Sequence, residues 1–142
     1  ELGVTSVGVC FLHAYMNPVH ERRMRDVLAE EHPGCAVSLS SEVLNEYREY
    51  ERAVTTLVDA FVKPRVAAYA RSIHDRLGRV PFYIMKSNGG VIAGREVHRQ
   101  PITTILSGPA AGVIGGRMVG AEIATIARKL VASTSTTGPP AA

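Results

Sequence analysis

The first forty residues alternate between apolar runs and one amphipathic stretch. Residues 4–12 carry hydrophobic side chains on both phases of a strand, which is typical of a buried strand in a parallel sheet. Asn17-Pro18 predicts an N-cap followed by proline at the first helical position, and a helix that ends at His32-Pro33-Gly34. Residues 35–39 alternate as a second strand. The order strand, helix, strand predicts a crossover unit of a parallel sheet.

A long amphipathic helix is predicted next. Apolar residues from Tyr50 to Leu77 advance mostly by threes and fours, as they do on one face of a helix. Pro64 lies inside this stripe, lacks a backbone donor and crowds the preceding turn, so we expect a kink or a break near residues 62–63. Gly78 is expected to close the helix.

The second half of the chain predicts two more strands and a small-residue helix. Residues 81–86 read as a third strand, and a short helical piece follows at 95–99. The β-branched residues of 102–106 predict a fourth strand. A helix rich in glycine and alanine then begins at Ser107, and residues 133–142 have the low-complexity composition of a disordered tail.

Two segments of this half are candidate ligand sites. The third strand runs into a tight turn in which asparagine and glycine can take positive φ; this turn comprises Ser87, Asn88, Gly89 and Gly90. The helix start offers backbone N–H groups directly after a strand, where open α/β sheets bind anions and nucleotides; its candidate residues are Ser107, Gly108, Pro109, Ala110 and Gly112. Neither a Walker loop nor a dinucleotide fingerprint is present. The alternatives are a plain chain reversal and a tightly packed structural helix.

Composition narrows the class of protein. With 142 residues, 46% hydrophobic and 20% charged, the chain fits one soluble domain. Its net charge of +3 is scattered, which argues against nucleic acid as a partner. By its hydrophobic pattern no apolar run approaches the roughly 20 residues that span a bilayer, and no signal peptide is recognisable, so we expect no membrane and a cytoplasmic location. Cys10 and Cys35 are expected to be buried thiols.

The titratable residues give no catalytic set. The five histidines lack metal-site spacing, so we expect no metal, and no serine, histidine and carboxylate arrangement supports nucleophilic catalysis. The charged segment 47–52 is expected to pair on a helix surface, as Arg48 can with Glu51. No Asp follows Asp75 and no Glu follows Glu122, so the end of the chain is poor in the carboxylates that a Mg-nucleotide site needs. The catalytic residues stay unknown.

Four stretches of the chain together resemble the A subunit of the hydantoinase and 5-oxoprolinase family, which includes N-methylhydantoinase A and subunits of acetone and acetophenone carboxylases. These stretches are CFLHAYMNPVHERR at 10–23, VSLSSEVLNEYREYERAVTTLVDAFVKP at 37–64, YIMKSNGGV at 83–91 and PITTILSGPAAGVIGG at 101–116. The resemblance implies an α/β fragment of an actin-like ATPase fold, similar to sugar kinases and heat-shock chaperones, with a mixed sheet and flanking helices. In that fold two lobes close on ATP, and residues 107–116 correspond to the connecting helix between the lobes.

The resemblance also implies what the chain does not contain. The family's first phosphate loop precedes anything present here. The second follows a strand for which residues 128–132 are the candidate, yet a Ser/Thr/Pro tail stands in its place. The implied domains are 1–48, the end of the family's N-terminal domain; 49–132, the start of the main domain; and 133–142, a disordered tail that does not match the family and reads as non-native.

The implied activity is ATP-dependent opening of a cyclic amide, with ATP and Mg bound by the intact protein and no cofactor by this fragment, which alone should be inactive. A ketone carboxylase subunit is one alternative. A non-catalytic interaction module left after loss of the phosphate loops is another. Implied partners are a hydantoinase B-type subunit or domain and further copies in an oligomer.

Overall fold

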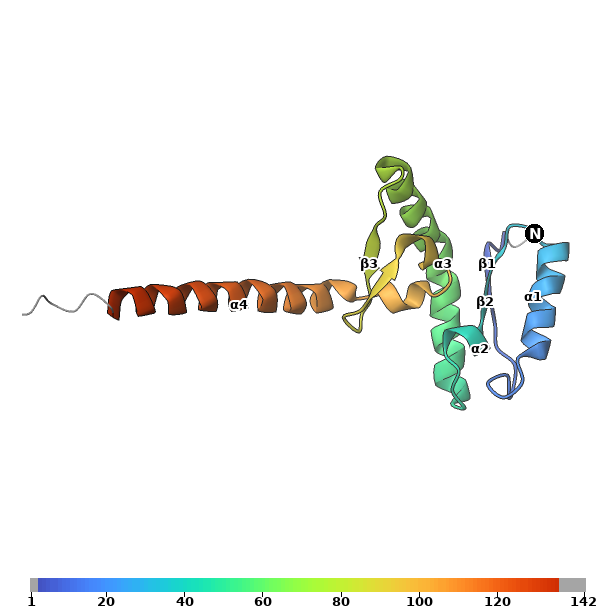
Figure 1. The fold of residues 1–142 in the computed structure, drawn as a ribbon. Coiled ribbons are helices and arrows are strands. Elements are labelled where there is room, and N and C mark those ends of the chain that lie inside the picture. Colours follow the sequence, from blue (N-terminus) through green and yellow to red (C-terminus); the bar gives the residue numbers. More distant parts are fainter. Residues whose placement is uncertain (1–2, 136–142) are drawn as a thin grey trace, which may run out of the picture.

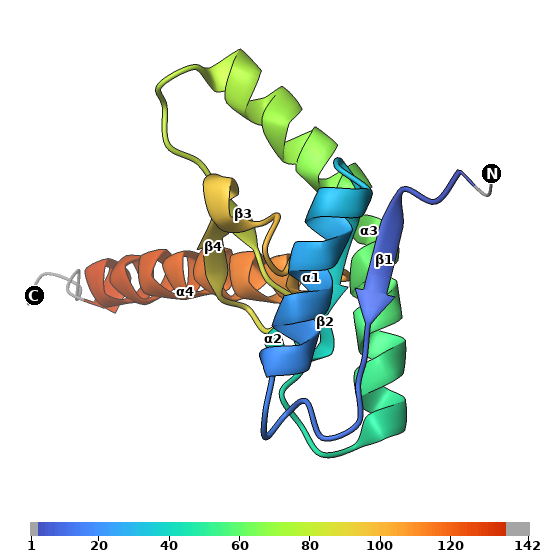
Figure 2. The same cartoon turned by 90° about the vertical axis from the view of Figure 1, so that its right-hand side faces the viewer.

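The N-terminal part is a parallel crossover unit. The computed structural model describes residues 3–135, with side chains up to residue 130. Strand β1 (Ser6–Val9) and strand β2 (Ala36–Leu39) pair in parallel, and α1 (Val19–Glu31) connects them across one face. Figure 2 shows α1 lying in front of the two strands. The predicted strand, helix, strand unit is therefore confirmed.

Helix α1 begins close to where the sequence places it. Pro18 is the residue before the helix, and the Asn17 side chain accepts a hydrogen bond from the Val19 N–H at 3.2 Å. His32 caps the other end, with its N–H bonded to the Leu28 carbonyl. Asn17 thus supplies an acceptor for one of the helix's first N–H groups, but Pro18 is the N-cap and not the first helical residue, so the helix begins one residue later than predicted.

Helix α3 (Glu49–Leu77) is the central element of the fold and follows the short helix α2 (Ser40–Val43). It covers β1 and β2 on the face opposite to α1 (Figure 2). Gly8 permits this approach, because a Cβ there would lie 3.3 Å from Leu57 Cδ2. The helix runs unbroken through Pro64, and its axis changes direction in its middle (Figure 2). Gly78 ends it at φ 60°.

A second, antiparallel pair follows α3. Strand β3 (Tyr83–Met85) pairs with β4 (Val91–Ala93), and the 3-10 turn η1 (Gly94–Glu96) comes next. Strand β4 was not predicted, because its three residues are too few to show an alternation. The two pairs form separate sheets in the described part of the chain, and not one mixed sheet as expected.

The predicted strand at 102–106 is wrong. Residues Pro101–Thr104 form a 3-10 turn, η2. The hydroxyl of Thr103 donates to the Gln100 carbonyl and that of Thr104 to the Pro101 carbonyl, each at 2.8 Å. These local side-chain bonds stabilise a turn in place of the strand that β-branched residues favour.

Helix α4 (Ser107–Ser135) projects away from the other elements (Figure 1). It begins at Ser107 as predicted, but it also includes residues 128–132, expected as a strand, and 133–135, expected as disordered tail. No proline interrupts the chain between Pro109 and Pro139, so nothing local ends the helix earlier. The rest of the expected tail, 136–142, lies outside the described residues.

The expectation that no run is long and apolar enough to span a bilayer also needs correction. Residues Ser107–Leu130 pass that test by length and composition, with a mean hydropathy of 1.2 and no part of the window buried. The apolar character of this segment is hard to recognise in the sequence, because it comes mostly from glycine and alanine and large apolar side chains are scattered among them. Core helices of soluble proteins pass the same test, so the finding is weak evidence for a membrane.

The core is small and unusually polar. Buried apolar side chains include Val9, Leu39 and Val97, but fully buried Glu21, Arg52 and Asp59 lie among them. Cys10 and Cys35 flank the strands as free, half-buried thiols, less covered than expected. Burying charged groups requires partners, and these partners define the sites below.

Candidate functional site

The two segments singled out from the sequence meet at one hollow of about 460 Å³. The turn between β3 and β4 forms one wall and the first turns of α4 form the other. Ser87, Asn88 and Gly89 thus face Pro109 and Ala110, together with Leu106, Val113 and Ile114. Gly90, Ser107, Gly108 and Gly112 do not line the hollow.

Backbone geometry fixes the turn. The Lys86 N–H donates to the Gly90 carbonyl at 2.7 Å, and the Asn88 side chain accepts from the Gly90 N–H at 3.1 Å. Gly89 has φ 85°, which side chains rarely adopt, and a Cβ there would lie 3.1 Å from Ile114 Cδ1. Glycine at this position therefore serves both the turn and the close approach of α4.

The chemistry of this hollow is mostly aliphatic. No lysine or arginine lines it, and its α4 wall consists of proline, alanine, valine and isoleucine. The N–H groups of the first α4 turn have no partner within the helix, as at every helix start. Leu106 enters that turn at φ 58°, in the left-handed region. Because the wall is aliphatic and carries no positive side chain, the hollow is better suited to packing against a neutral group or another chain segment than to binding a phosphate.

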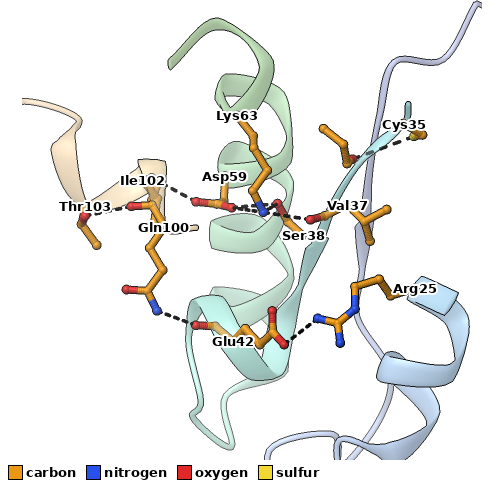
Figure 3. Close-up of polar contacts among 11 residues, drawn as sticks. Arg25, Cys35, Val37, Ser38, Glu42, Asp59, Lys63, Gln100, Ile102 and Thr103 are labelled. Atoms are coloured by element: carbon orange, nitrogen blue, oxygen red, sulfur yellow. Dashed lines mark hydrogen bonds and ion pairs between the residues drawn. The ribbon is translucent and has the colours of Figure 1, made fainter. Parts of the chain in front are cut away.

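Asp59 connects this region to the rest of the fold. Its carboxylate is fully buried on α3 and accepts hydrogen bonds from the Ser38 hydroxyl at 2.7 Å and the Ile102 N–H at 3.0 Å (Figure 3). Lys63 Nζ lies 3.6 Å from the same carboxylate and donates to the Val37 carbonyl at 2.8 Å. One carboxylate thus joins β2, α3 and η2.

Turn η2 links Asp59 to the turn that lines the hollow. The Thr103 carbonyl accepts a hydrogen bond from the Ser87 N–H at 2.7 Å. Ile102 and Thr103 are adjacent, so one short segment is fixed by Asp59 on one side and holds the Ser87 turn on the other. Asp59 is therefore a positioning residue for the hollow. No signal in the sequence set Asp59 apart from the other acids of the same helix, Glu49, Glu51 and Asp75.

A second set of polar contacts ties α1, α2 and the segment before η2 together. Arg25 pairs with Glu42 at 2.9 Å, and the Gln100 amide donates to the Glu42 carbonyl at 2.9 Å (Figure 3). These residues line a groove of about 720 Å³ with Lys63 and Arg99. Both groups of the ion pair are about half exposed, so the pair adds little stability.

The loop after β1 is held by a buried acid. The Glu21 carboxylate accepts from the Phe11 N–H at 2.9 Å, from the Ser40 hydroxyl at 2.6 Å, and from both the N–H and hydroxyl of Ser41. Burial by itself raises the pKa of the Glu21 carboxyl, but these hydrogen bonds outweigh it and hold the pKa below its ordinary value.

Arg52 holds the same loop from the other side, and it is buried although its sequence position predicted a surface site. The segment 47–52 was expected on a surface, and Arg48 does pair with Glu51 at 3.7 Å. Arg52, however, is fully buried, donates to the Phe11 carbonyl at 2.8 Å and lies 5.5 Å from the centre of the Tyr15 ring. Its Nε and Nη1 have no hydrogen-bond partner among the described residues. The stacked Tyr15 ring offsets part of that cost.

The described side chains hold no group of three or more histidine, cysteine, aspartate or glutamate residues that could bind a metal ion. His74 and His98 are exposed.

Comparison with known proteins shows which proteins this chain is similar to. A family profile described as hydantoinase/oxoprolinase matches residues 52–135. The chain is 37% identical over 116 residues to a 5-oxoprolinase of Saccharomyces cerevisiae, a match that covers 80% of this chain and 9% of that protein. It is 32% identical over 123 residues to the caprolactamase alpha subunit of Pseudomonas jessenii, covering 84% and 18%.

A solved structure shares the fold. The nucleotide-free acetone carboxylase structure, from work on ATP-dependent acetone carboxylation, superposes with a TM-score of 0.63 at 26% sequence identity. The match covers 81% of this chain and 17% of that one. This chain thus spans less than a fifth of the length of these relatives.

Proposed function

Since this chain belongs to the hydantoinase/oxoprolinase family, we propose that it forms part of an enzyme that uses ATP to activate a carbonyl oxygen. Phosphorylating the oxygen of a cyclic amide makes its carbon electrophilic, so that water attacks it, the ring C–N bond breaks and a second water releases the phosphate. Phosphorylating the enol oxygen of a ketone instead traps the enol, whose nucleophilic α-carbon attacks CO2 while the phosphate leaves and the carbonyl forms again. The relatives named as 5-oxoprolinase and caprolactamase favour cyclic amides, and acetone carboxylase supports the ketone alternative. The activating step is common to both.

The observation that carries the proposal is the meeting of the Ser87 turn with the start of α4. In an actin-like ATPase the connecting helix between the lobes must pack tightly and still allow closure on ATP. The aliphatic hollow, Gly89 against Ile114 and the anchored η2 turn support this role for residues 107–116. The groups that bind the phosphates and Mg of ATP, and the catalytic groups, then lie in other parts of the intact enzyme, including a B-type subunit.

Two experiments test the proposal. Calorimetry with ATP and Mg on the 142-residue chain should give no binding heat, beside a full-length relative that binds; micromolar affinity of the chain would contradict it. In the second, residues 3–116 replace the matching segment of the acetone carboxylase beta subunit of Xanthobacter autotrophicus, to which this chain is 28% identical. The assembled chimera should retain ATP hydrolysis, whereas a folded but inactive chimera would argue against a shared role.

The same chimera allows a matched pair of variants. Gly89→Val removes the positive φ and the space before Ile114, and should reduce ATP turnover at least tenfold. Gly34→Val changes a glycine with equally positive φ but open space around it, far from the hollow, and controls for the backbone effect. An equal loss of ATP turnover in both variants would mean that the hollow has no specific role in the activity.

A further inference from the structure

Another hollow, of about 290 Å³, lies between the C-terminal half of α3 and the segment around η1. It shares no residue with the hollow at the Ser87 turn. Its floor is apolar: Ala67 and Ala70 come from α3, and the Phe82 ring lies directly over Gly94, where any Cβ would meet the ring. The Gly94 N–H donates to the Phe82 carbonyl at 2.9 Å. This backbone bond holds the two sides of the floor together.

The rim of the same hollow is basic. It carries four basic residues and no acid; these are Arg71, His74, Arg95 and His98. In the sequence they are spread over 28 positions, and only the packing of η1 against α3 brings them to one place. The side chains of Arg71, His74 and His98 make no hydrogen bond or ion pair with any described residue. We call this site the basic hollow.

The acids nearest to the basic hollow do little to neutralise it. Arg95 lies 3.8 Å from Glu96, but 87% of the Arg95 side chain is exposed, so this pair is weak. Asp75 lines an adjoining, larger hollow and not this one. A cleft lined by charges of one sign concentrates ions of the opposite sign. The unpaired cations therefore favour an anion as the occupant.

We propose that the basic hollow binds a small organic carboxylate. The planar fork of Arg71 can donate to both oxygens of a carboxylate, while the alanines and the Phe82 ring cover an apolar body. The volume is at the lower end for ligand sites and limits that body to about one six-membered ring. An inorganic anion would leave the apolar floor uncovered. This binding does not depend on the ATP chemistry proposed above.

Proton NMR of the 142-residue chain tests the proposal, with sodium benzoate as the probe at constant ionic strength. The chain has five histidines, whose ring signals can be assigned with single histidine-to-glutamine variants. Benzoate should shift the signals of His74 and His98 with half-saturation at about 1 mM. The signals of the other three should not move. Equal shifts of all five histidines, or no saturable shift, would overturn the proposal.

Two further probes separate the charge from the apolar body. Benzamide has the ring of benzoate without its charge, and acetate has the charge without the ring. Each should need about tenfold more ligand for the same shift, because each loses one of the two kinds of contact. Inorganic phosphate that shifts His74 and His98 as strongly as benzoate does would show a general attraction of anions and contradict a carboxylate site. No nucleotide is present, so failure here leaves the ATP proposal unaffected.

A matched pair of variants locates the binding. Arg71→Gln removes the fork and should weaken benzoate binding about fivefold. Arg76→Gln makes the same change of charge on the same helix outside the basic hollow, and should alter binding by less than about twofold. Ala67→Leu fills the floor and should abolish the shifts while circular dichroism shows unchanged helix content. Equal effects of the two arginine variants, or full binding by Ala67→Leu, would refute the proposal.

Discussion

Replacing Asp59 by alanine should lower the free energy of unfolding of this protein more than replacing any of its surface charges does. The variant leaves the Ser38 hydroxyl and the Ile102 N–H without their acceptor, and removes the carboxylate beside Lys63. Hydrogen bonds to a charged group contribute about 1.5–3 kcal/mol each, so two of them set the loss at about 3–6 kcal/mol. Lys63 keeps its bond to the Val37 carbonyl, which limits the further cost of an unpaired ammonium.

Urea denaturation followed by circular dichroism measures that loss, with Asp75→Ala as the control, since Asp75 is exposed on the same helix. The control should change the free energy of unfolding by less than about 0.5 kcal/mol. Asp59→Asn retains an acceptor for Ile102 and should lose only about half as much. A loss below about 1 kcal/mol in Asp59→Ala would refute the view that this carboxylate joins β2, α3 and η2.

Two other predictions concern buried positions. The pKa of Glu21 is lower in the folded than in the unfolded protein, so the stabilisation from its carboxylate is complete above about pH 5 and is lost as the pH falls through the folded pKa. Urea midpoints measured between about pH 3 and 7 should therefore fall toward acid pH, and Glu21→Gln should flatten this dependence. Gly94→Ala places a Cβ onto the Phe82 ring, where overpacking costs about 1–3 kcal/mol; an unchanged urea midpoint would mean that the ring moves freely.

The local pattern was sufficient for most helices and for the first two strands. Asn17-Pro18 and Gly78 marked helix ends that the structure confirms, because capping and positive φ depend on neighbouring residues alone. The pattern failed at 102–106, where β-branched residues favour a strand but threonine side chains and Asp59 hold a turn. At 128–132 the family resemblance, and not the local pattern, implied a strand, whereas the helix continues there.

The sequence by itself determined the family, the crossover unit and the two segments that form the hollow, because motifs and periodicity are properties of residues close together in the chain. Only the tertiary structure decided that Arg52 is buried, that Asp59 joins three elements and that the Ser87 turn meets α4. These facts depend on contacts between residues tens of positions apart. A charged side chain has the same local signature on a surface as in a core, so its role follows from the partners that the fold brings to it.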